Sequence, residues 1–309
     1  MQKLGTWLLK ALLRLLGLLP LRIHYALGGF VAWLASDVIR YRRDVVVHNL
    51  ARSFPEKNFW ELKPIRKEFY RHFGELIAET VWFGGCNAKR LRRQRLVEVE
   101  NPEVGEHLFQ SAPSLVLLSS HCGNWELAGG ILTYNFTDIP LSFTEQNFCV
   151  VYREPSSKVW DAVMRDNRTA PLADSKHFPG YIESRSIIRY AYSHRAEKKV
   201  YNLMTDQRPY FASSANMDVE FLGQKAQTMT GGAALACKFG LAVAYVTMRR
   251  DRRGHYLLRY TPICENASRM SVEQIMKQYY TLLEKDIREQ PANYLWTHKR
   301  FENYNTQNT

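Results

Sequence analysis

Beyond residue 97 the chain alternates short apolar runs with longer amphipathic stretches. The run at 115–118, Leu-Val-Leu-Leu, is apolar without alternation, which is typical of a strand that is covered on both faces. Comparable patterns predict strands at 114–119, 147–152, 200–204, 217–221 and 242–248, and helices near 126–134, 157–167, 182–194, 229–239 and 272–289. Such alternation predicts the α/β class, with an α/β/α sandwich around a mixed, largely parallel sheet.

Before residue 97 the pattern is helical. Residues 44–82 are predicted to be helical, with apolar positions at helical spacing up to the pair Gly84 and Gly85. There is no repeat period and no low-complexity linker that would separate two independent units. We therefore expect one catalytic domain at 44–309, preceded by a short helical segment at 1–43 that associates with a membrane.

The membrane expectation comes from two apolar stretches. Residues 4–19 are rich in leucine, yet cations recur on one helical face, which is the pattern of a helix lying in a membrane interface. The stretch 25–39 is followed by Arg40, Arg42 and Arg43, which favour the cytoplasmic side. Neither stretch reaches the roughly 18 to 20 uncharged residues of a comfortable span. An interfacial anchor is the favoured interpretation, ahead of a single span, a signal peptide, or ordinary core helices of a soluble protein.

Composition and net charge indicate which kinds of partner the chain binds. The chain has 42 Lys plus Arg against 30 Asp plus Glu, a net charge of +12, which predicts an anionic partner. The densest basic run, at 89–95, would suit anionic lipid beside a membrane. No nucleic-acid motif or aromatic single-strand platform accompanies the charge, so no nucleic acid is expected. Five scattered cysteines favour a reducing compartment, and neither a metal site nor a cofactor loop is indicated.

The candidate chemistry lies at residues 121–126, His-Cys-Gly-Asn-Trp-Glu, where the strand at 114–119 ends. Open α/β sheets bind ligands at the carboxyl edge of their strands, so a loop histidine there is a candidate general base. His121 and Glu126 are five positions apart and would meet only if His121 lies on the loop and Glu126 on the following helix, for which Asn124 is a candidate N-cap.

The same segment resembles the lipid A biosynthesis late acyltransferases, the lauroyl and myristoyl transferases of the H-x4-D/E acyltransferase group. Further blocks agree in order between residues 40 and 301: 41–50 with Ser-Phe-Pro-Glu at 53–56, then 151–153, 205–207, 221–223 with 228–231, and a closing pattern at Pro291, Tyr294, Trp296, His298, Arg300 and Phe301. The chain departs from the family at 154–157, where an Asn-Pro pair is often found, and at 136–148. These departures bear on acyl-chain and acceptor preference.

The resemblance implies direct acyl transfer, with His121 as general base and Glu126 as the acid that orients it. It also makes Arg153, Asp206 and Gln207 expected members of the site, together with Asn124. Arg153 is a candidate for binding phosphate, carboxylate or oxyanion, and Asp206 for orienting a hydroxyl, pairing with Arg153 or capping a turn. Cys122 is the alternative nucleophile of a covalent mechanism.

The expected activity is transfer of a fatty acyl chain from an acyl carrier protein thioester to a hydroxyl of a lipid A precursor, at the cytoplasmic face of the inner membrane. Within that chemistry, another glycolipid or an amino-acid lipid remains open as acceptor, and a coenzyme A thioester as donor. A lipid hydrolase or thioesterase, and a non-catalytic basic membrane-binding protein, are the rivals from other classes.

Overall fold

The computed structural model describes residues 2–209 and 216–301. Its main sheet has seven strands in the order β1-β9-β8-β2-β5-β3-β4, and all neighbours are parallel except β8 and β9. These strands are β1 (Val97–Val99), β2 (Leu115–Ser119), β3 (Phe148–Tyr152), β4 (Tyr181–Glu183), β5 (Val200–Met204), β8 (Ala242–Arg252) and β9 (His255–Cys264). The predicted mixed, largely parallel sheet is confirmed.

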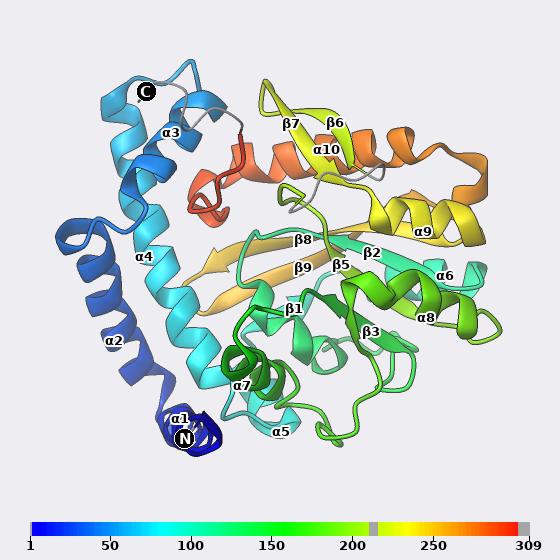
Figure 1. The fold of residues 1–309 in the computed structure, drawn as a ribbon, viewed down its shortest axis with the longest axis horizontal. Helices are drawn as coiled ribbons and strands as arrows, with labels where there is room; N and C mark the ends of the chain where they lie inside the picture. Colours follow the sequence, from blue (N-terminus) through cyan, green and yellow to red (C-terminus); the bar gives the residue numbers. More distant parts are fainter. Residues whose placement is uncertain (1, 210–215, 302–309) are drawn as a thin grey trace.

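The sheet separates two apolar cores. Along β2, Val116 and Leu118 belong to one buried cluster, whereas Leu115 and Leu117 belong to the other. Both faces of the strand are therefore covered, which is why its sequence is apolar without alternation. Figure 1 shows α9 and α10 on one side of the sheet and α5 on the other. The helices after α4 are α5 (Ala88–Gln94), α6 (Pro102–Ser111), α7 (Lys158–Arg168), α8 (Ile187–Ser193), α9 (Gly231–Phe239) and α10 (Val272–Glu289).

Two expected elements differ in detail. The segment at 217–221 is a strand, but it pairs with β7 in a separate antiparallel hairpin, β6 (Asn216–Phe221) and β7 (Gln224–Met229), rather than with the main sheet. The helix expected at 182–194 begins as strand β4 and a 3₁₀ turn (Ser184–Ser186) before α8 starts. Short strands such as β1 and β4 carry too few residues to show a period, so the pattern did not predict them.

The chain before β1 is helical, as expected. It comprises α1 (Gln2–Leu18), α2 (Leu21–Trp33), a π-helical turn (Leu34–Val38), α3 (Arg43–Ser53) and α4 (Phe59–Phe83). Helix α2 crosses α4 where two glycines meet, because a Cβ added to Gly28 would lie 2.5 Å from the Gly74 carbonyl oxygen. Only glycine permits so close a backbone approach. Whether 1–43 is a unit separate from the rest of the chain stays a prediction.

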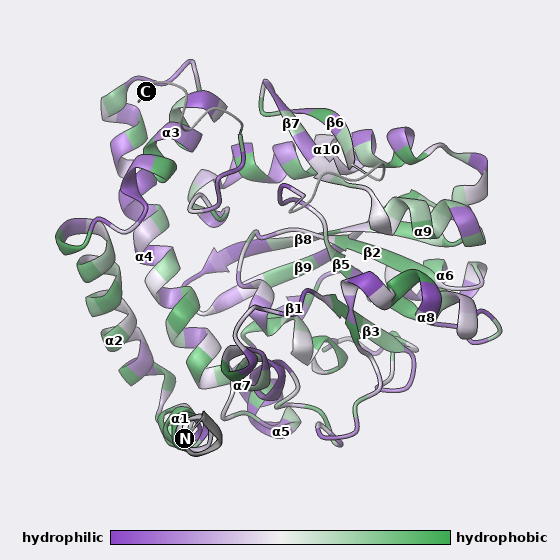
Figure 2. Cartoon of the chain, viewed as in Figure 1, coloured by the Kyte–Doolittle hydropathy of each residue, from purple (hydrophilic) through white to green (hydrophobic). Residues whose placement is uncertain are grey.

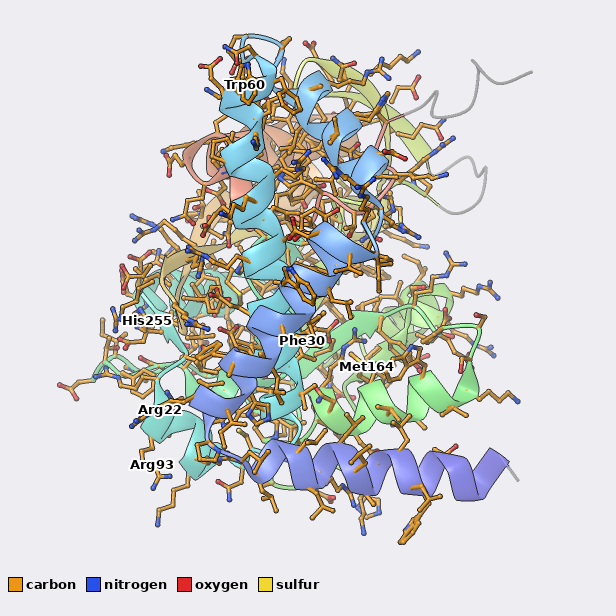
Figure 3. All side chains as sticks on the ribbon, turned by 90° about the vertical axis from the view of Figure 1, so that its left-hand side faces the viewer. Arg22, Phe30, Trp60, Arg93, Met164 and His255 are labelled. Carbon is orange, nitrogen blue, oxygen red and sulfur yellow. The ribbon has the colours of Figure 1, made fainter. Side chains whose placement is uncertain are left out.

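Helices α1 and α2 carry exposed apolar side chains. Figure 2 shows both helices as largely hydrophobic, and Figure 3 shows α1 and α2 along one side of the molecule, where Phe30 lies. Within the described residues, no single helix is long and apolar enough to cross a membrane; one pair passes by length and composition, Gly5–Leu18 with Leu21–Val38, but it bends by 117°. The most exposed apolar residues here are Trp7, Leu8, Leu12, Leu15, Leu18, Leu27, Phe30 and Trp33.

Candidate active site

The register of the sheet brings His121 and Asp206 together. Strands β2 and β5 are parallel neighbours in which Ser119 is opposite Met204, and each functional residue lies two positions beyond these. Parallel strands end at the same edge of a sheet, so the two loops begin side by side. The Nδ1 atom of His121 lies 2.7 Å from Oδ1 of Asp206. The structure thus provides a histidine–carboxylate pair at the carboxyl edge of the sheet.

Asp206 is suited to stabilising a positive imidazole. Its side chain is almost completely buried. Burial raises the pKa of the Asp206 carboxyl, but the attraction of His121 and the hydrogen bonds that the carboxylate accepts lower it further, so the net pKa is below the ordinary value. An ionised Asp206 accepts a hydrogen bond from the Nδ1–H group of His121, which leaves Nε2 as the acceptor nitrogen of a neutral ring.

The second ring nitrogen of His121, Nε2, faces Gln207. The amide Nε2 of Gln207 lies 3.1 Å from Nε2 of the imidazole, so with the ring in this tautomer the amide donates to it. The ring of Trp125 packs edge-on against the imidazole, with 4.8 Å between the ring centroids. His121 is therefore fixed on both nitrogens and on one face.

The loop that carries His121 is fastened by the C-terminal segment. The backbone N–H of Gly123 donates to the carbonyl of Asn293 at 3.0 Å, and the N–H of Leu295 donates to the carbonyl of His121 at 3.1 Å. Gly123 has φ of +66°, and a Cβ there would come within 2.7 Å of the Met248 side chain. Glycine is required at this point by both the backbone angle and the space.

Glu126 has a different partner from the one expected. We predicted that Glu126 holds the imidazole, but the carboxylate bonded to His121 is that of Asp206, and Glu126 instead accepts a two-pronged bond from Arg168. The Arg168 Nε lies 2.7 Å from Oε2, and Nη2 lies 2.8 Å from Oε1. Trp125 Nε1 also donates to Oε1 at 3.1 Å, so Glu126 touches the residue that packs on His121. Its predicted catalytic role stays a prediction.

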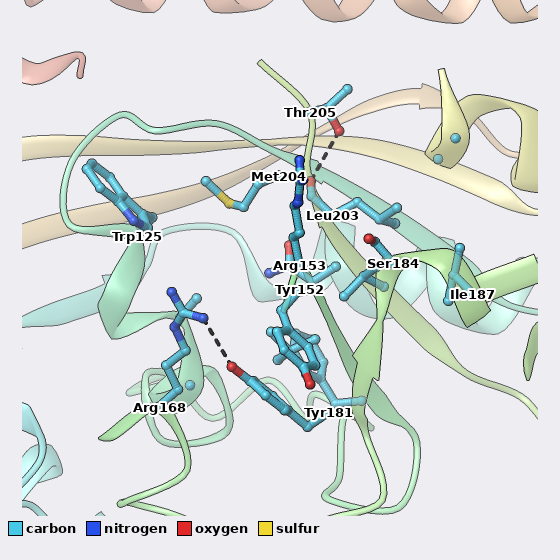
Figure 4. Close-up of a pocket in the computed structure, with 18 of the residues that line it drawn as sticks. Trp125, Tyr152, Arg153, Arg168, Tyr181, Ser184, Ile187, Leu203, Met204 and Thr205 are labelled. Carbon is cyan, nitrogen blue, oxygen red and sulfur yellow. Dashed lines mark hydrogen bonds between the residues drawn. The ribbon is translucent and has the colours of Figure 1, made fainter. Parts of the chain in front are cut away.

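Arg168 is held as a partly buried cation. Burial lowers the pKa of its guanidinium, but the hydrogen bond and the negative charge of Glu126 outweigh this and raise the pKa above its ordinary value. A further bond of 3.1 Å runs from Nη1 to the hydroxyl of Tyr181 and is drawn in Figure 4. The ion pair links the 3₁₀ helix Trp125–Thr133 to the end of α7, on which Arg168 lies.

Asn124 lies in the protein interior and does not act as an N-cap. Its side chain makes no N-cap hydrogen bond, contrary to the expectation. It is fully buried, and its amide donates to Oε2 of Glu79 at 2.9 Å. Glu79 also accepts from the hydroxyls of Tyr25, at 2.8 Å, and Tyr256, at 2.9 Å. Burial raises the pKa of Glu79. Asn124 therefore joins the active-site loop to α4 and, through Glu79, to α2; its predicted contact with substrate stays a prediction.

A cavity of about 560 Å³ opens beside His121. Arg153, which follows β3, and Gln207 lie on its wall, and Glu126 and Arg168 line it as well. Asp206 and Asn124 are not among its lining residues, because they lie behind the loop. Figure 4 shows Trp125, Arg153, Arg168 and Tyr181 around the space. Most of the remaining wall is apolar or aromatic, including Ile131, Leu132, Phe148, Val151, Leu172, Phe178, Ile187, Leu203 and Met229. Such a lining suits a hydrocarbon chain.

The comparisons with known proteins agree with the sequence blocks. Residues 1–303 match the family described as bacterial lipid A biosynthesis acyltransferase. The chain belongs to this family. It is also 25% identical over 311 residues to the lipid A biosynthesis lauroyltransferase of Escherichia coli (strain K12), and the match covers 96% of this chain and 90% of the relative.

The family blocks at the two ends of the chain contact each other. The amide of Asn49, in the N-terminal block, donates to the carbonyls of Trp296 and His298, at 2.8 Å each. Arg300 is buried and donates to the carbonyl of Gln227 at 2.8 Å. Burial lowers the pKa of His298 to about 4. The residues of the closing pattern are thus fixed to the rest of the chain, and their segment in turn holds the His121 loop.

Cys122 is placed for packing. Its side chain is 3% exposed, and burial raises the pKa of its thiol well above the ordinary value, whereas a nucleophilic cysteine needs a lowered pKa. It does not line the cavity beside His121.

We expect Cys122→Ala to keep most of the acyltransferase activity, because the thiol is buried, has a raised pKa and does not line the cavity. The measurement is the initial rate of the variant after its melting temperature has been compared with the wild type, since removing a buried sulfur leaves a small void. Complete loss of activity in a variant that still folds would support an acyl-enzyme on Cys122.

Proposed function

We propose that this protein transfers a fatty acyl chain from an acyl carrier protein thioester to a hydroxyl of a lipid A precursor. The observation that carries the proposal is the His121–Asp206 pair at 2.7 Å, with the other imidazole nitrogen beside a largely apolar cavity. Family membership supports lipid A acylation as the process. The name of the lauroyltransferase relative supports a saturated chain as the group transferred.

In the proposed reaction, His121 carries both proton steps. The acceptor hydroxyl replaces the Gln207 amide at Nε2 and gives up its proton as its oxygen attacks the thioester carbonyl. Asp206 stabilises the imidazolium that forms. The tetrahedral intermediate then collapses, the carbon–sulfur bond breaks, and the imidazolium returns the proton to the departing thiolate. An ester and a free thiol result, and the histidine is neutral again.

We assign supporting roles to the remaining predicted residues. Arg153 and Gln207, on the cavity wall, are the candidates for holding the oxyanion or a phosphate of the acceptor. Glu126 is proposed as a positioning residue that acts through Trp125, because its oxygens are occupied by Arg168 and the indole N–H. Asn124 supports the loop from behind.

The test is a transfer assay on purified protein and its His121→Ala variant. A lauroyl acyl carrier protein thioester is offered with and without the lipid A precursor, and the products are identified by mass spectrometry. The expected result is an acceptor that gains one acyl mass with wild type and does not gain it with the variant. Free fatty acid released regardless of acceptor would overturn the proposal in favour of a hydrolase, and transfer only to another glycolipid or amino-acid lipid would change the acceptor.

We also propose that α1 and α2 lie on the cytoplasmic face of the inner membrane. Lys10 and Arg14 reach Asp166 of α7, at 2.9 and 3.4 Å. Four leucines of α1 are more than half exposed, namely Leu8, Leu12, Leu15 and Leu18. Phe30 and Trp33 of α2 are likewise more than half exposed. Apolar side chains gathered on one side of a molecule are typical of a surface that lies in a membrane interface.

Replacing Leu27 and Phe30 together with glutamate should lower binding to vesicles of phosphatidylethanolamine and phosphatidylglycerol by about tenfold or more, because each buried apolar side chain contributes about 1.5–3 kcal/mol when it is withdrawn from water. Cosedimentation with the vesicles measures the effect. Tyr192→Glu is the matched control, since Tyr192 is 56% exposed and Phe30 is 57% exposed, but Tyr192 lies on α8. Equal sedimentation of all three proteins would contradict the proposed orientation.

A further inference from the structure

Helix α8 presents an exposed face that mixes arginines with apolar side chains. Arg185, Ile188, Arg189 and Tyr192 recur at spacings of three and four, so they share one side of the helical turn that begins at Ser184. Ile188 is 39% exposed and Tyr192 is 56% exposed, and all the arginines among them are exposed. Arg195, just past the helix, continues the face, because its guanidinium lies 4.5 Å from the centre of the Tyr192 ring.

In the described part of the chain, two arginines of this face have no carboxylate partner. Among the described residues, neither Arg189 nor Arg195 is found in a salt bridge with a carboxylate. Of the two acidic residues nearest in sequence, Glu183 accepts the backbone N–H of Arg185 at 2.7 Å, and Glu197 pairs with Lys199 at 2.6 Å. A partner with several carboxylates would therefore meet cations and apolar side chains together.

The α8 face is continuous with the rim of the active-site cavity. Ser184, Arg185 and Ile187 all line the cavity beside His121, and Figure 4 shows Ser184 and Ile187 on its wall. Arg185 is at once exposed and on that wall, so it lies where the cavity meets the surface. A partner seated on α8 is therefore next to the entrance through which a tethered thioester would reach the histidine.

A membrane is the less suitable occupant of this face. Figure 1 shows α2 along the left edge of the molecule and α8 toward the right, with the sheet between them. The continuous apolar surface is on α1 and α2, whereas α8 offers only two apolar side chains among arginines. A bilayer that contacts α1 and α2 leaves α8 open to a protein partner.

We propose that the face formed by Arg185, Ile188, Arg189, Tyr192 and Arg195 is the docking surface for an acidic carrier protein that delivers the acyl thioester. The inference rests on the proposed function, since it names the surface by which the same site receives its donor. Carboxylates of the partner pair with the arginines, and the apolar side chains pack against the partner between them. Docking of this kind weakens as salt rises, because exposed ion pairs are screened.

The experiment measures docking separately from catalysis. Fluorescence anisotropy of labelled lauroyl acyl carrier protein gives the affinity for wild type and for the double variant Arg189→Glu/Arg195→Glu, neither residue being on the cavity wall. We expect the variant to bind about tenfold or more weakly at low salt. Lys277→Glu/Arg288→Glu, the same charge change at two exposed residues of α10, should bind as wild type does. Turnover of a lauroyl-pantetheine thioester should be unchanged in both, because this donor has no protein surface.

Three results would overturn the docking surface. These are wild type that does not bind the carrier, a double variant that binds it as well as wild type does, and a double variant that instead loses affinity for vesicles. Equal loss of turnover with both donors would also count against it, since the substitutions would then act on the site. A further outcome separates the two proposals. If wild type binds the carrier, the double variant binds it weakly, and wild type transfers no acyl group, then the docking surface is retained and the proposed reaction is rejected.

Discussion

Replacing Asp206 with asparagine should lower the rate of acyl transfer on the order of 10³- to 10⁴-fold, the size of effect seen when the carboxylate of a histidine pair is neutralised. The amide keeps the volume of the side chain but carries no charge. The amide can also donate to Nδ1, which favours the tautomer with the proton on Nε2. In that tautomer Nε2 cannot accept the proton of the acceptor hydroxyl. The loss therefore falls on kcat more than on KM.

The pH dependence separates this role from a structural one. Because the pKa of Asp206 is below its ordinary value, the carboxylate stays ionised throughout the neutral and mildly acidic range and does not itself produce an acid limb there. Without the neighbouring negative charge the imidazolium is less stable, so we expect the acid limb of Asp206→Asn to move to lower pH. Glu197→Gln, a change at an exposed carboxylate that precedes the start of β5, is the control. An Asp206→Asn enzyme with near-normal kcat would exclude the pair as the base.

The sequence predicted both members of this pair but not that they meet. The strands at 114–119 and 200–204 were predicted with their ends, and His121 and Asp206 follow those ends at the same distance. What the apolar pattern lacks is the order of strands across the sheet: β2 and β5 are neighbours although β3 and β4 lie between them in the chain. Periodicity is a local property, whereas neighbours in a sheet depend on how all of the crossovers pack.

For Glu126, the sequence suggested a contact that the structure does not contain. Its spacing from His121 suggested a contact, but the chain offered no sign that Arg168, forty-two positions away at the end of α7, would take up both carboxylate oxygens. The same holds for Asn124, whose partner Glu79 comes from α4. In each case the local element was expected, and a side chain distant in sequence determined what the polar group does. A buried charge requires a partner, and the sequence does not say which residue supplies it.

Some of the blocks that resemble the family have a structural role. Asn49 and the 294–301 segment match the family at opposite ends of the chain, and the structure places them in contact through the carbonyls of Trp296 and His298. Leu295 in turn bonds the backbone of His121. Positions that the sequence marked only as family-like blocks therefore form the frame that holds the histidine loop in place.

Removing the carboxylate of Glu126 should be the second most damaging change. In Glu126→Ala, Arg168 keeps its charge in a mostly buried position without its partner, and Trp125 loses an acceptor beside the histidine. We expect activity to fall about 10²- to 10³-fold, the size of loss associated with a small misplacement of catalytic groups. Breaking a buried ion pair from one side should also cost about 3–5 kcal/mol of the free energy of unfolding. Initial rates and denaturant unfolding measure the two effects.

The partner variant decides how Glu126 acts. If Glu126 works through its ion pair, Arg168→Ala should damage the enzyme in a similar way, and the double variant Glu126→Ala/Arg168→Ala should be clearly better than the sum of the single losses, because no charge is left buried alone. Glu126→Asp should be impaired rather than inactive, since the shorter side chain keeps the charge but loses the two-pronged geometry. If instead Glu126 directly stabilises the imidazolium, Glu126→Gln should move the acid limb of the pH profile as Asp206→Asn does. An unmoved acid limb, together with the non-additive double variant, would assign Glu126 to positioning and leave Asp206 as the charge that serves His121.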